Sequence, residues 1–351
     1  AAAFLMAEMV GVPYADIAVK AILPAFLYFL GIFIAVHLEA LRTGLRGLKK
    51  EDLPHFGKLV LRQGYLLLPL IILVWMVMAG FTMARSAVIA TLVAIVVSMF
   101  RKETRMTPSG FITVLENGTK NTISVAIACG VAGIIAGVVT MTGLGQVLIS
   151  AIVGMSNGNL LIALMLTMLT CIVLGMGVPT TANYIIMATT CAPILVSGMG
   201  VNAIAANMFV FYFGIIADIT PPVALAAYAG SAIAKSNPMK TGINATKLAI
   251  AAFIVPFIFA YNPQMLFENV TSVFQVIQIV ITALLGIFAV AAGLEGYILR
   301  TMHWPLRVLA VIGGLTLLIP GTVSDLIGLV IVAGIIVLQV MQNKKAAREA
   351  V

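Results

Sequence analysis

Asp218 is the residue in this chain whose type and position most clearly suggest chemistry. It is the only acidic residue between Glu116 and Glu268, and it lies in an apolar stretch. An Asp at the centre of a membrane helix costs about 2.5–3.5 kcal/mol, which is usually tolerated where the carboxylate faces a cavity, a cation or a polar partner. Asp218 opens the run Asp218-Ile219-Thr220-Pro221-Pro222. Because tandem prolines remove hydrogen-bond donors, the run predicts a discontinuous helix over Asn202 to Lys235, with a transport site at its break.

A second polar interruption carries similar residue types. The run Gly175-Met176-Gly177-Val178-Pro179-Thr180-Thr181-Ala182-Asn183 separates two apolar pieces, Asn159 to Leu174 and Asn183 to Val196. Each piece is short for a comfortable membrane crossing. Glycine, proline and hydroxyl residues between such pieces favour a re-entrant hairpin over residues 158–200 with a non-helical tip.

Two interrupted helices in one membrane protein would expose backbone groups that can bind ligands. Carbonyls at the end of a first half-helix suit Na⁺, and amides at the start of a second half suit a carboxylate. At helical spacing, Asn207 and Asp218 share one face with Gly214 between them. The pattern therefore favours an ion-coupled transporter over a pore or a scaffold.

The same residues also allow purely structural roles. Asp218 could only cap the second half-helix, and proline kinks occur in membrane helices that hold no site. The individual roles of Thr180, Thr181 and Asn183 are equally open. Because Asp218 can carry a proton, H⁺ could replace Na⁺ as the coupling ion.

The composition shows what kind of protein must position these residues. The chain has 351 residues, of which 62% are apolar and 9% charged. An average soluble domain carries about 25% charged residues, so a soluble globular protein is excluded. Repeated apolar runs near the roughly 20 residues that a crossing helix needs predict an all-α polytopic membrane protein.

The apolar runs also predict the individual spans. Besides the hairpin and the broken helix, the expected spans are Tyr14 to Ala40, Gly64 to Gly80, Arg85 to Phe100, Asn121 to Met141, Ile243 to Tyr261, Gln275 to Leu299, Leu306 to Ile319 and Asp325 to Met341. A basic loop is expected from Leu41 to Arg62, and a polar stretch from Arg101 to Lys120 could lie along the membrane surface. Nearly all Lys and Arg then fall on one side, which predicts a cytoplasmic C-terminus. The net charge of +8 is thus explained by topology, and no nucleic-acid partner is expected.

Other functional classes lack their required residues. Acid–base or metal catalysis in a membrane would need clustered histidines or carboxylates, whereas His37, His55 and His303 are scattered. No phosphate-binding loop of an ATP-driven pump is present, since the run from Gly230 to Ser236 lacks its second glycine. We therefore expect no enzyme, no cofactor and no metal other than Na⁺ as coupling ion. A channel or another ion-coupled secondary transporter remains the alternative.

The two interrupted segments closely resemble a known transporter family. Residues 175–183 and the run Ala217-Asp218-Ile219-Thr220-Pro221-Pro222-Val223-Ala224-Leu225-Ala226-Ala227-Tyr228 are similar to the fused permeases of TRAP (tripartite ATP-independent periplasmic) transporters of the TAXI type. The opening Ala1-Ala2-Ala3-Phe4-Leu5-Met6-Ala7-Glu8 resembles the stretch that follows the first broken-helix loop of their large membrane domain. The resemblance covers about residues 1–262, and the last three spans resemble the variable C-terminal extension of fused permeases.

The resemblance implies an inverted-repeat elevator fold in a bacterial inner membrane. Two hairpins and two broken helices would surround the sites and slide past a static scaffold, and a TAXI-type periplasmic binding protein would deliver an organic acid. The implied Na⁺ ligands are Gly175, Gly177, Pro179, Asp218 and Thr220. The implied substrate contacts are Thr180, Thr181, Asn183 and Pro222, to which the shared helix face adds Asn207.

The resemblance also divides the chain. Residues 1–40 would end the first repeat, 41–142 would form the linker loop and scaffold or arm helices, and 143–262 the second repeat, with the hairpin at 158–200 and the broken helix at 202–235. Residues 263–351 would form an extension of about three membrane helices. The first hairpin and the first half of its broken helix would then lie upstream of Ala1. A faint repeat agrees, because Pro24 precedes Phe26 and Tyr28 much as Pro256 precedes Phe259 and Tyr261.

Overall fold

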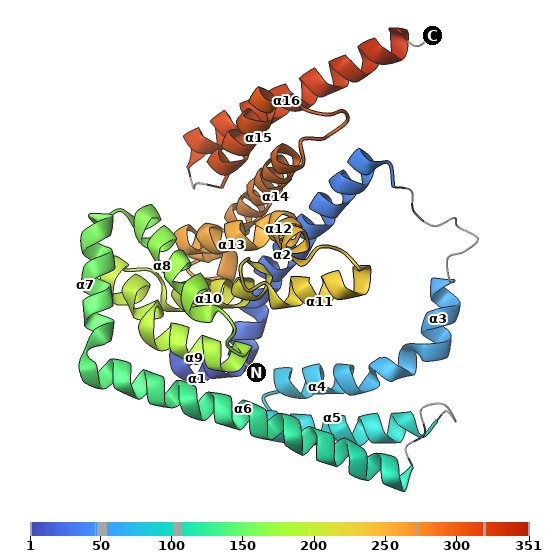
Figure 1. Cartoon of the computed structure of the whole chain (residues 1–351), viewed down its shortest axis with the longest axis vertical. Helices are drawn as coiled ribbons and strands as arrows, with labels where there is room; N and C mark the ends of the chain where they lie inside the picture. The colour runs from blue at the N-terminus through green and yellow to red at the C-terminus, as the bar shows by residue number, and fades with distance from the viewer. Residues whose placement is uncertain are drawn as a thin grey trace. The chain divides into compact units, whose positions relative to one another are not determined.

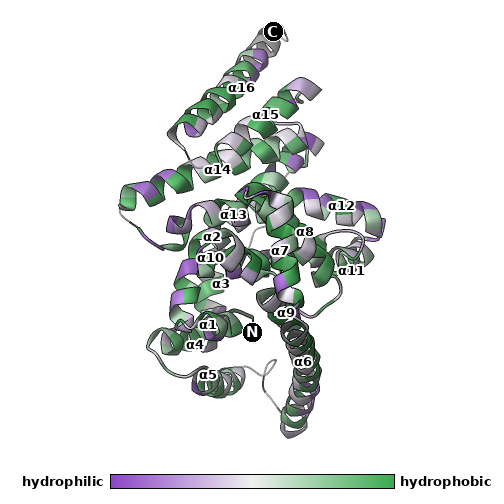
Figure 2. Cartoon of the chain, turned by 90° about the vertical axis from the view of Figure 1, so that its left-hand side faces the viewer, coloured by the Kyte–Doolittle hydropathy of each residue, from purple (hydrophilic) through white to green (hydrophobic). Residues whose placement is uncertain are grey.

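The computed structural model describes residues 2–45, 47, 55–100, 105, 107–270, 272–318 and 321–349. Within these residues all regular structure is helical, apart from an isolated bridge between Tyr297 and Thr301. Five of the described helices are long and apolar enough to cross a membrane, or six if one bent pair counts as a span. Hydrophobic residues dominate most of the helices (Figure 2). The prediction of an all-α polytopic membrane protein is confirmed.

The chain forms two compact units, and the smaller comprises Val12–Asp16 and Arg46–Ile127. Its helices are α3 (Phe56–Gln63), α4 (Leu68–Met78), α5 (Met83–Ser98) and the first part of α6 (Figure 1). α4 packs against α5, and these two helices match the predicted spans from Gly64 to Gly80 and from Arg85 to Phe100. α3 begins within the segment expected to be a basic loop, so that prediction is wrong for residues 56–62; residues 46 and 48–54 of the expected loop lie outside the described residues.

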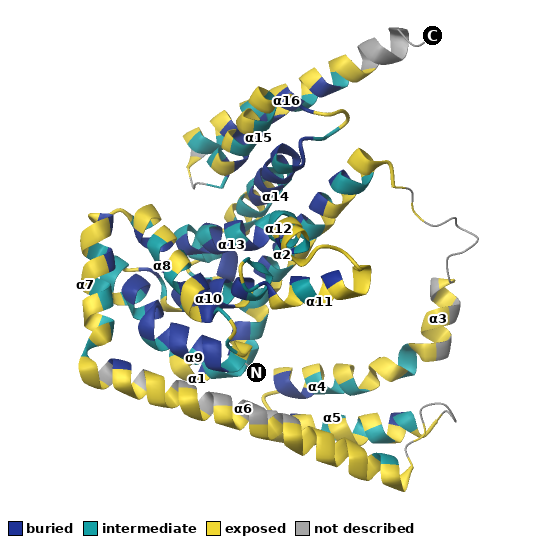
Figure 3. Ribbon diagram, viewed as in Figure 1, coloured by how far each residue is buried: buried dark blue, intermediate teal, exposed yellow. Residues whose placement is uncertain are grey.

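α6 (Pro108–Thr142) is one long helix where the sequence predicted a polar stretch followed by a span. The expected boundary at Lys120 is wrong, because helical hydrogen bonding continues through it. Lys120 pairs with Glu116 one turn earlier at 2.6 Å, an i,i+4 ion pair that supports helix in a polar segment. The described side chains of α6 are mostly exposed (Figure 3). Residues 101–104 and 106 of the predicted polar stretch lie outside the described residues.

The larger unit comprises Ala1–Gly11, Ile17–Leu45 and Ala128–Val351. It starts with α1 (Ala2–Val10), followed by α2 (Tyr14–Thr43), which extends three residues beyond its predicted end at Ala40. At Gly31, α2 packs closely against two other helices. A Cβ added there would overlap the Cβ of Ala251 in α13 (Ile250–Tyr261) and lie 3.0 Å from Ile287 in α14 (Val273–Glu295). A glycine at this position therefore lets three helices pack together.

The centre of the larger unit contains short helices. They are α7 (Leu144–Ser156), α8 (Leu160–Gly175), α9 (Thr180–Thr190), a π-helical turn (Ile194–Gly198), α10 (Ala203–Ile216), α11 (Leu225–Ala234), α12 (Pro238–Leu248) and α13. Three of them begin at asparagines whose side chains accept hydrogen bonds from backbone N–H groups: Asn159 for α8, Asn202 for α10 and Asn237 for α12. α7 was not predicted as an element. The predicted span from Ile243 to Tyr261 lies within one of the five candidate membrane spans, Pro238–Tyr261, which α12 and α13 form together with a single turn residue at Ala249.

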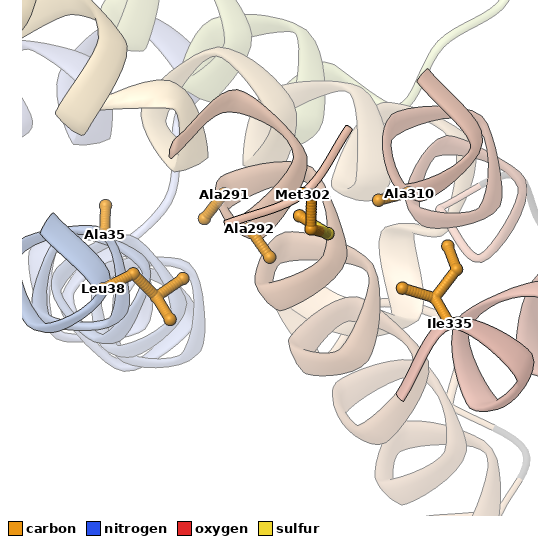
Figure 4. Close-up of a cluster of buried hydrophobic side chains, with 7 residues drawn as sticks. All are labelled: Ala35, Leu38, Ala291, Ala292, Met302, Ala310 and Ile335. Carbon is orange, nitrogen blue, oxygen red and sulfur yellow. The ribbon is translucent and has the colours of Figure 1, made fainter. Parts of the chain in front are cut away.

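Three helices follow the centre: α14, α15 (Trp304–Thr316) and α16 (Thr322–Glu349). α14 ends four residues before the predicted Leu299, because Gly296 adopts a left-handed conformation (φ +70°) that terminates the helix. Gly286 of α14 and Gly314 of α15 cross so closely that a Cβ on either would lie within 2.9 Å of the other's carbonyl oxygen. A buried apolar cluster joins these helices to α2 (Figure 4); its members are Ala35, Leu38, Ala291, Ala292, Met302, Ala310 and Ile335.

Candidate ion and substrate site

The first interruption follows α8, and it is shorter than predicted. α8 ends at Gly175, Gly177 adopts φ +74°, and α9 begins at Thr180 directly after Pro179. Glycine provides the left-handed conformation that ends a helix, and proline fits immediately before a helix start. The non-helical segment is therefore Met176–Pro179. The prediction that it extends to Asn183 is wrong, because Asn183 already donates its backbone N–H to the carbonyl of Pro179.

The second interruption separates α10 from α11 and confirms the predicted discontinuous helix. α10 ends at Ile216, one 3₁₀ turn covers Ala217–Ile219, and α11 begins at Leu225. The Thr220 hydroxyl donates to the carbonyl of Ile216 at 2.7 Å.

Two further hydroxyl groups hold this interruption from neighbouring helices. Tyr228 donates to the carbonyl of Pro222 at 2.7 Å, and Thr246 of α12 donates to the carbonyl of Ile219 at 3.0 Å. The segment between α10 and α11 is thus held in place by hydrogen bonds. Its backbone carbonyls have side-chain donors from α11 and α12, which fix the direction of the connecting segment.

The two interruptions meet at Asn183 and Gly214. The Asn183 amide nitrogen Nδ2 donates to the Gly214 carbonyl at 2.8 Å, across a separation of 31 residues. A Cβ added to Gly175 would lie 3.1 Å from Asn183 Nδ2 and 3.1 Å from the Gly214 oxygen, and one added to Gly214 would lie 3.1 Å from both Asn183 polar atoms. The last residue of α8 and the last turn of α10 therefore lie against the same amide side chain.

Partial negative charge gathers at this meeting point. The C-terminal end of a helix carries a partial negative charge and carbonyls without intrahelical partners, and here two such ends converge. Asn183 is only 2% exposed, yet its carbonyl oxygen Oδ1 has no hydrogen-bond partner among the described residues. A buried polar atom without a partner costs roughly 1–3 kcal/mol. A bound cation would remove that cost.

Tyr184 forms a second connection between α9 and α10. Its hydroxyl donates to Asn207 Oδ1 at 2.8 Å, and its ring meets Phe211 edge-on at 5.8 Å between centroids. Asn207 in turn donates to the carbonyl of Ala203. The predicted common face of Asn207 and Asp218 required an unbroken helix, whereas α10 ends before Asp218.

The predicted site residues differ in their surroundings. Gly175 and Asn183 are buried at the meeting point; Thr181, Asn207, Asp218 and Thr220 are half-buried; Gly177, Pro179, Thr180 and Pro222 are exposed. The carboxylate of Asp218 has no hydrogen bond or ion pair within the described part of the chain. Of the predicted site residues, Gly175 therefore lies against Asn183, whereas the four exposed residues remain open to the surroundings.

Three contributors to this arrangement could not be identified from the sequence. The carbonyl of Gly214, the hydroxyl of Tyr184 and the hydroxyl of Thr246 all contact residues from another helix. α1 also packs against α9 and α10, with Met6 fully buried. Such contacts depend on how helices pack, so local spacing carries no signal for them.

The fold and this arrangement define a class: a polytopic membrane protein with two helix interruptions that meet around a buried amide oxygen. The family model of the tripartite ATP-independent periplasmic transporter, DctM component, matches residues 1–274. The chain belongs to this family. No curated protein and no solved structure matched the chain. The expected resemblance to TRAP permeases is confirmed for the family.

Membership determines the general activity. The chain is the large permease component of a TRAP transporter, so the expectation of a transporter rather than an enzyme is confirmed. The family implies a periplasmic binding protein as partner. Together with the apolar helices, it indicates a multi-pass protein of the inner membrane.

Proposed function

We propose that this permease carries out Na⁺-coupled uptake of an organic acid. Family membership supports transport with a periplasmic binding protein, which we infer to be of the TAXI type from the resemblance of residues 175–183 and 217–228. The observation that supports Na⁺ as the coupling ion is that two helix C-termini converge on Asn183 Oδ1, which has no hydrogen-bond partner among the residues that the structure describes. Na⁺ binds oxygen ligands, and unwound carbonyls at helix C-terminal ends provide them in transporters of this kind.

The proposed ion site combines backbone and side-chain oxygens. Its ligands would come from the Gly175 to Pro179 segment, including Gly177, and from Asp218 and Thr220. Asn183 was predicted as a substrate contact, but its buried position favours the role of an ion ligand.

The proposed substrate contacts lie at the starts of α9 and α11. A helix N-terminus offers free N–H groups and partial positive charge, which suits the carboxylate of an organic acid. Thr180 is exposed in the first turn of α9, followed by the half-buried Thr181. Pro222 is exposed in the segment that leads to α11, and Asn207 is half-buried on α10.

We further propose an elevator mechanism with the C-terminus in the cytoplasm. The mobile part would contain the two interruptions, and the close α2–α13–α14 packing at Gly31 would suit the static scaffold. The orientation is inferred from the basic residues, because loops on the cytoplasmic side are rich in Lys and Arg. Arg300 follows α14, and Arg307 donates to carbonyls at the end of that helix. Three more basic residues lie near the end of α16: Lys344, Lys345 and Arg348.

H⁺ coupling is the second candidate, and one observation favours it. The half-buried Asp218 has neither a hydrogen bond nor an ion pair within the described residues, so nothing in them holds it ionised. A carboxyl in that position can take up and release a proton as its access to water changes.

Uptake measurements distinguish these proposals. The permease is reconstituted in proteoliposomes with its binding protein, and uptake of a panel of labelled organic acids is followed under an inward Na⁺ gradient or a pH gradient. Na⁺ coupling predicts uptake only with Na⁺, and a loss of about tenfold or more in Asp218→Asn, equivalent to about 1.4 kcal/mol of lost stabilisation. The matched control is Asp16→Asn, an exposed carboxylate in the first turn of α2, which should transport normally.

Other outcomes of this experiment would contradict Na⁺ coupling. Uptake driven by a pH gradient without Na⁺, and lost in Asp218→Asn, would establish H⁺ coupling instead. Uptake indifferent to Na⁺, to pH gradients and to Asp218→Asn would refute both versions of the site.

A further inference from the structure

A polar pocket of about 240 Å³ lies away from the two interruptions, at the N-terminal ends of α14 and α16. Asn262 and Gln264 line it from the segment after α13, Gln278 and Thr282 from α14, and Asp325 from the first turn of α16. None of these residues contributes to the proposed ion or substrate site. The last three lie beyond residue 274, where the family match ends.

The charge of this pocket is negative. Asp325 is the only charged residue among the described residues that line it, and no Lys or Arg joins it there. Gln278 Nε2 donates to Asp325 Oδ2 at 3.1 Å, which leaves the carboxylate able to accept further hydrogen bonds. The remaining polar lining consists of amides and a hydroxyl, which both donate and accept. The pocket therefore suits a ligand with one ammonium group and several neutral or acceptor oxygens.

An apolar groove of about 440 Å³ adjoins the pocket and shares Gln278, Thr282 and Asp325 with it. Its other walls are apolar side chains of α14 and α16, namely Phe274, Ile277, Ile281, Leu326 and Leu329. Phe274 is 73% exposed and Leu326 63% exposed. A compartment for a polar group thus opens onto a groove that a hydrocarbon chain can cover. Only an amphipathic molecule would match both parts.

We propose that this site binds a phospholipid with a primary-amine headgroup, such as phosphatidylethanolamine. The ammonium would pair with Asp325, the amide N–H groups would donate to phosphate and glycerol oxygens, and one acyl chain would lie along Ile277 and Ile281. A headgroup without an ammonium, such as phosphatidylglycerol, would place its phosphate near a carboxylate with no cation between them. Asp325 also favours the start of α16 through the helix dipole, but that effect does not require the adjoining groove.

Native mass spectrometry can test this proposal without a transport assay. The permease is reconstituted in nanodiscs with equal phosphatidylethanolamine and phosphatidylglycerol, released into detergent, and the retained lipids are counted. We expect about fivefold preference for phosphatidylethanolamine, because a partly exposed charge pair contributes about 1 kcal/mol. Asp325→Asn should abolish that preference, and Gln278→Lys should also abolish it by supplying an ammonium to Asp325. Asp16→Asn, the control, should keep it.

A second pair of variants tests the acyl chain. Ile281→Trp fills the groove and should reduce the retention of both lipids several-fold, whereas Val337→Trp, at a 56% exposed position on α16 outside the groove, should not. Each variant is first required to show the wild-type unfolding temperature within a few degrees. Equal retention of the two lipids by the wild type, or unchanged preference in Asp325→Asn, would overturn the proposal. Loss of preference in Asp325→Asn with full retention in Ile281→Trp would also overturn it, in favour of a free amine.

Discussion

Asn183 links the two interruptions more directly than any other predicted residue. Its Nδ2 atom binds the Gly214 carbonyl, and its Oδ1 atom is buried without a partner in the described structure. An amide side chain is suited to this position because one end donates to a helix carbonyl while the other stays available as a ligand. This division of roles would let the residue act both as a structural contact and as a ligand of the proposed ion site.

The first prediction concerns Na⁺ binding at this residue. In wild-type protein, Na⁺ should raise the unfolding temperature, because a ligand that binds only the folded state stabilises it by mass action. Asn183→Ala removes the proposed ligand and leaves the Gly214 carbonyl without its donor, so we expect a loss of roughly 1–3 kcal/mol in stability and no remaining response to Na⁺. The measurement is thermal unfolding in NaCl and in choline chloride.

Asn159→Ala is the matched control for that experiment. Asn159 caps α8 on an exposed surface, so its loss should cost about 1 kcal/mol while the response to Na⁺ persists. A normal Na⁺ response in Asn183→Ala would contradict the proposed role of the amide oxygen.

Among the helices, the packing of α2 depends on one small residue. Gly31 lies against Ala251 of α13 and Ile287 of α14, and a Cβ there would meet the Ala251 Cβ directly. Small residues allow membrane helices to approach closely, and van der Waals contact then holds them together. α2 belongs to the part predicted as the end of a first repeat, while α13 belongs to the predicted second repeat, so Gly31 packs one against the other.

The second prediction tests this helix contact. Gly31→Ala should destabilise the protein by about 1–3 kcal/mol, because α2 must shift to relieve the overlap and part of its packing is lost. Gly154→Ala in α7 is the control, since a Cβ there meets nothing within 4 Å and alanine favours helix. Unfolding in graded denaturant would measure both. Equal stability of the two variants would show that the α2 contact is not tight in the membrane.

Across the larger unit, charged residues join parts of the chain that are far apart in sequence. Glu295 at the end of α14 is 2% exposed; it lies 2.8 Å from Lys247 of α12 and 3.9 Å from Arg42 of α2. Near the other end of α2, Lys20 pairs with Glu268 at 3.0 Å. Ion pairs therefore link α2 both to the segment before α14 and to the end of α14.

The third prediction follows from the burial of Glu295. Lys247→Met leaves this carboxylate beside the more distant Arg42 and the neighbouring Glu39 carboxyl, so we expect a loss of roughly 2–4 kcal/mol, reduced from the fully buried case because Lys247 is 29% exposed. The double variant Lys247→Met with Glu295→Leu should recover much of that loss. Lys120→Met, which breaks the exposed pair with Glu116, is the control and should cost less than about 1 kcal/mol. Additive effects of the two substitutions in the double variant would contradict a direct pair.

The sequence predicted the class of fold and the two interruptions, because both depend on local properties. Apolar composition reflects the lipid solvent around each helix. Pro179, Pro221 and Pro222 lie near glycine or in tandem, which favours a helix break, whereas the isolated Pro24 and Pro256 lie inside helices. Local pattern was less informative where helix continues through polar residues, as at Lys120 in α6, or where a short apolar helix such as α7 lacks distinctive limits.

The meeting of the interruptions could not be predicted from sequence. Asn183 and Gly214 are 31 residues apart, and only the packing of α8, α9 and α10 brings the amide to the carbonyl. The same holds for Tyr184 with Asn207 and for the pocket that Asp325 shares with α14. Proline and glycine act on their own backbone, so their effects can be read locally. A binding site instead depends on distances between helices, and those are set by how side chains from separate segments pack.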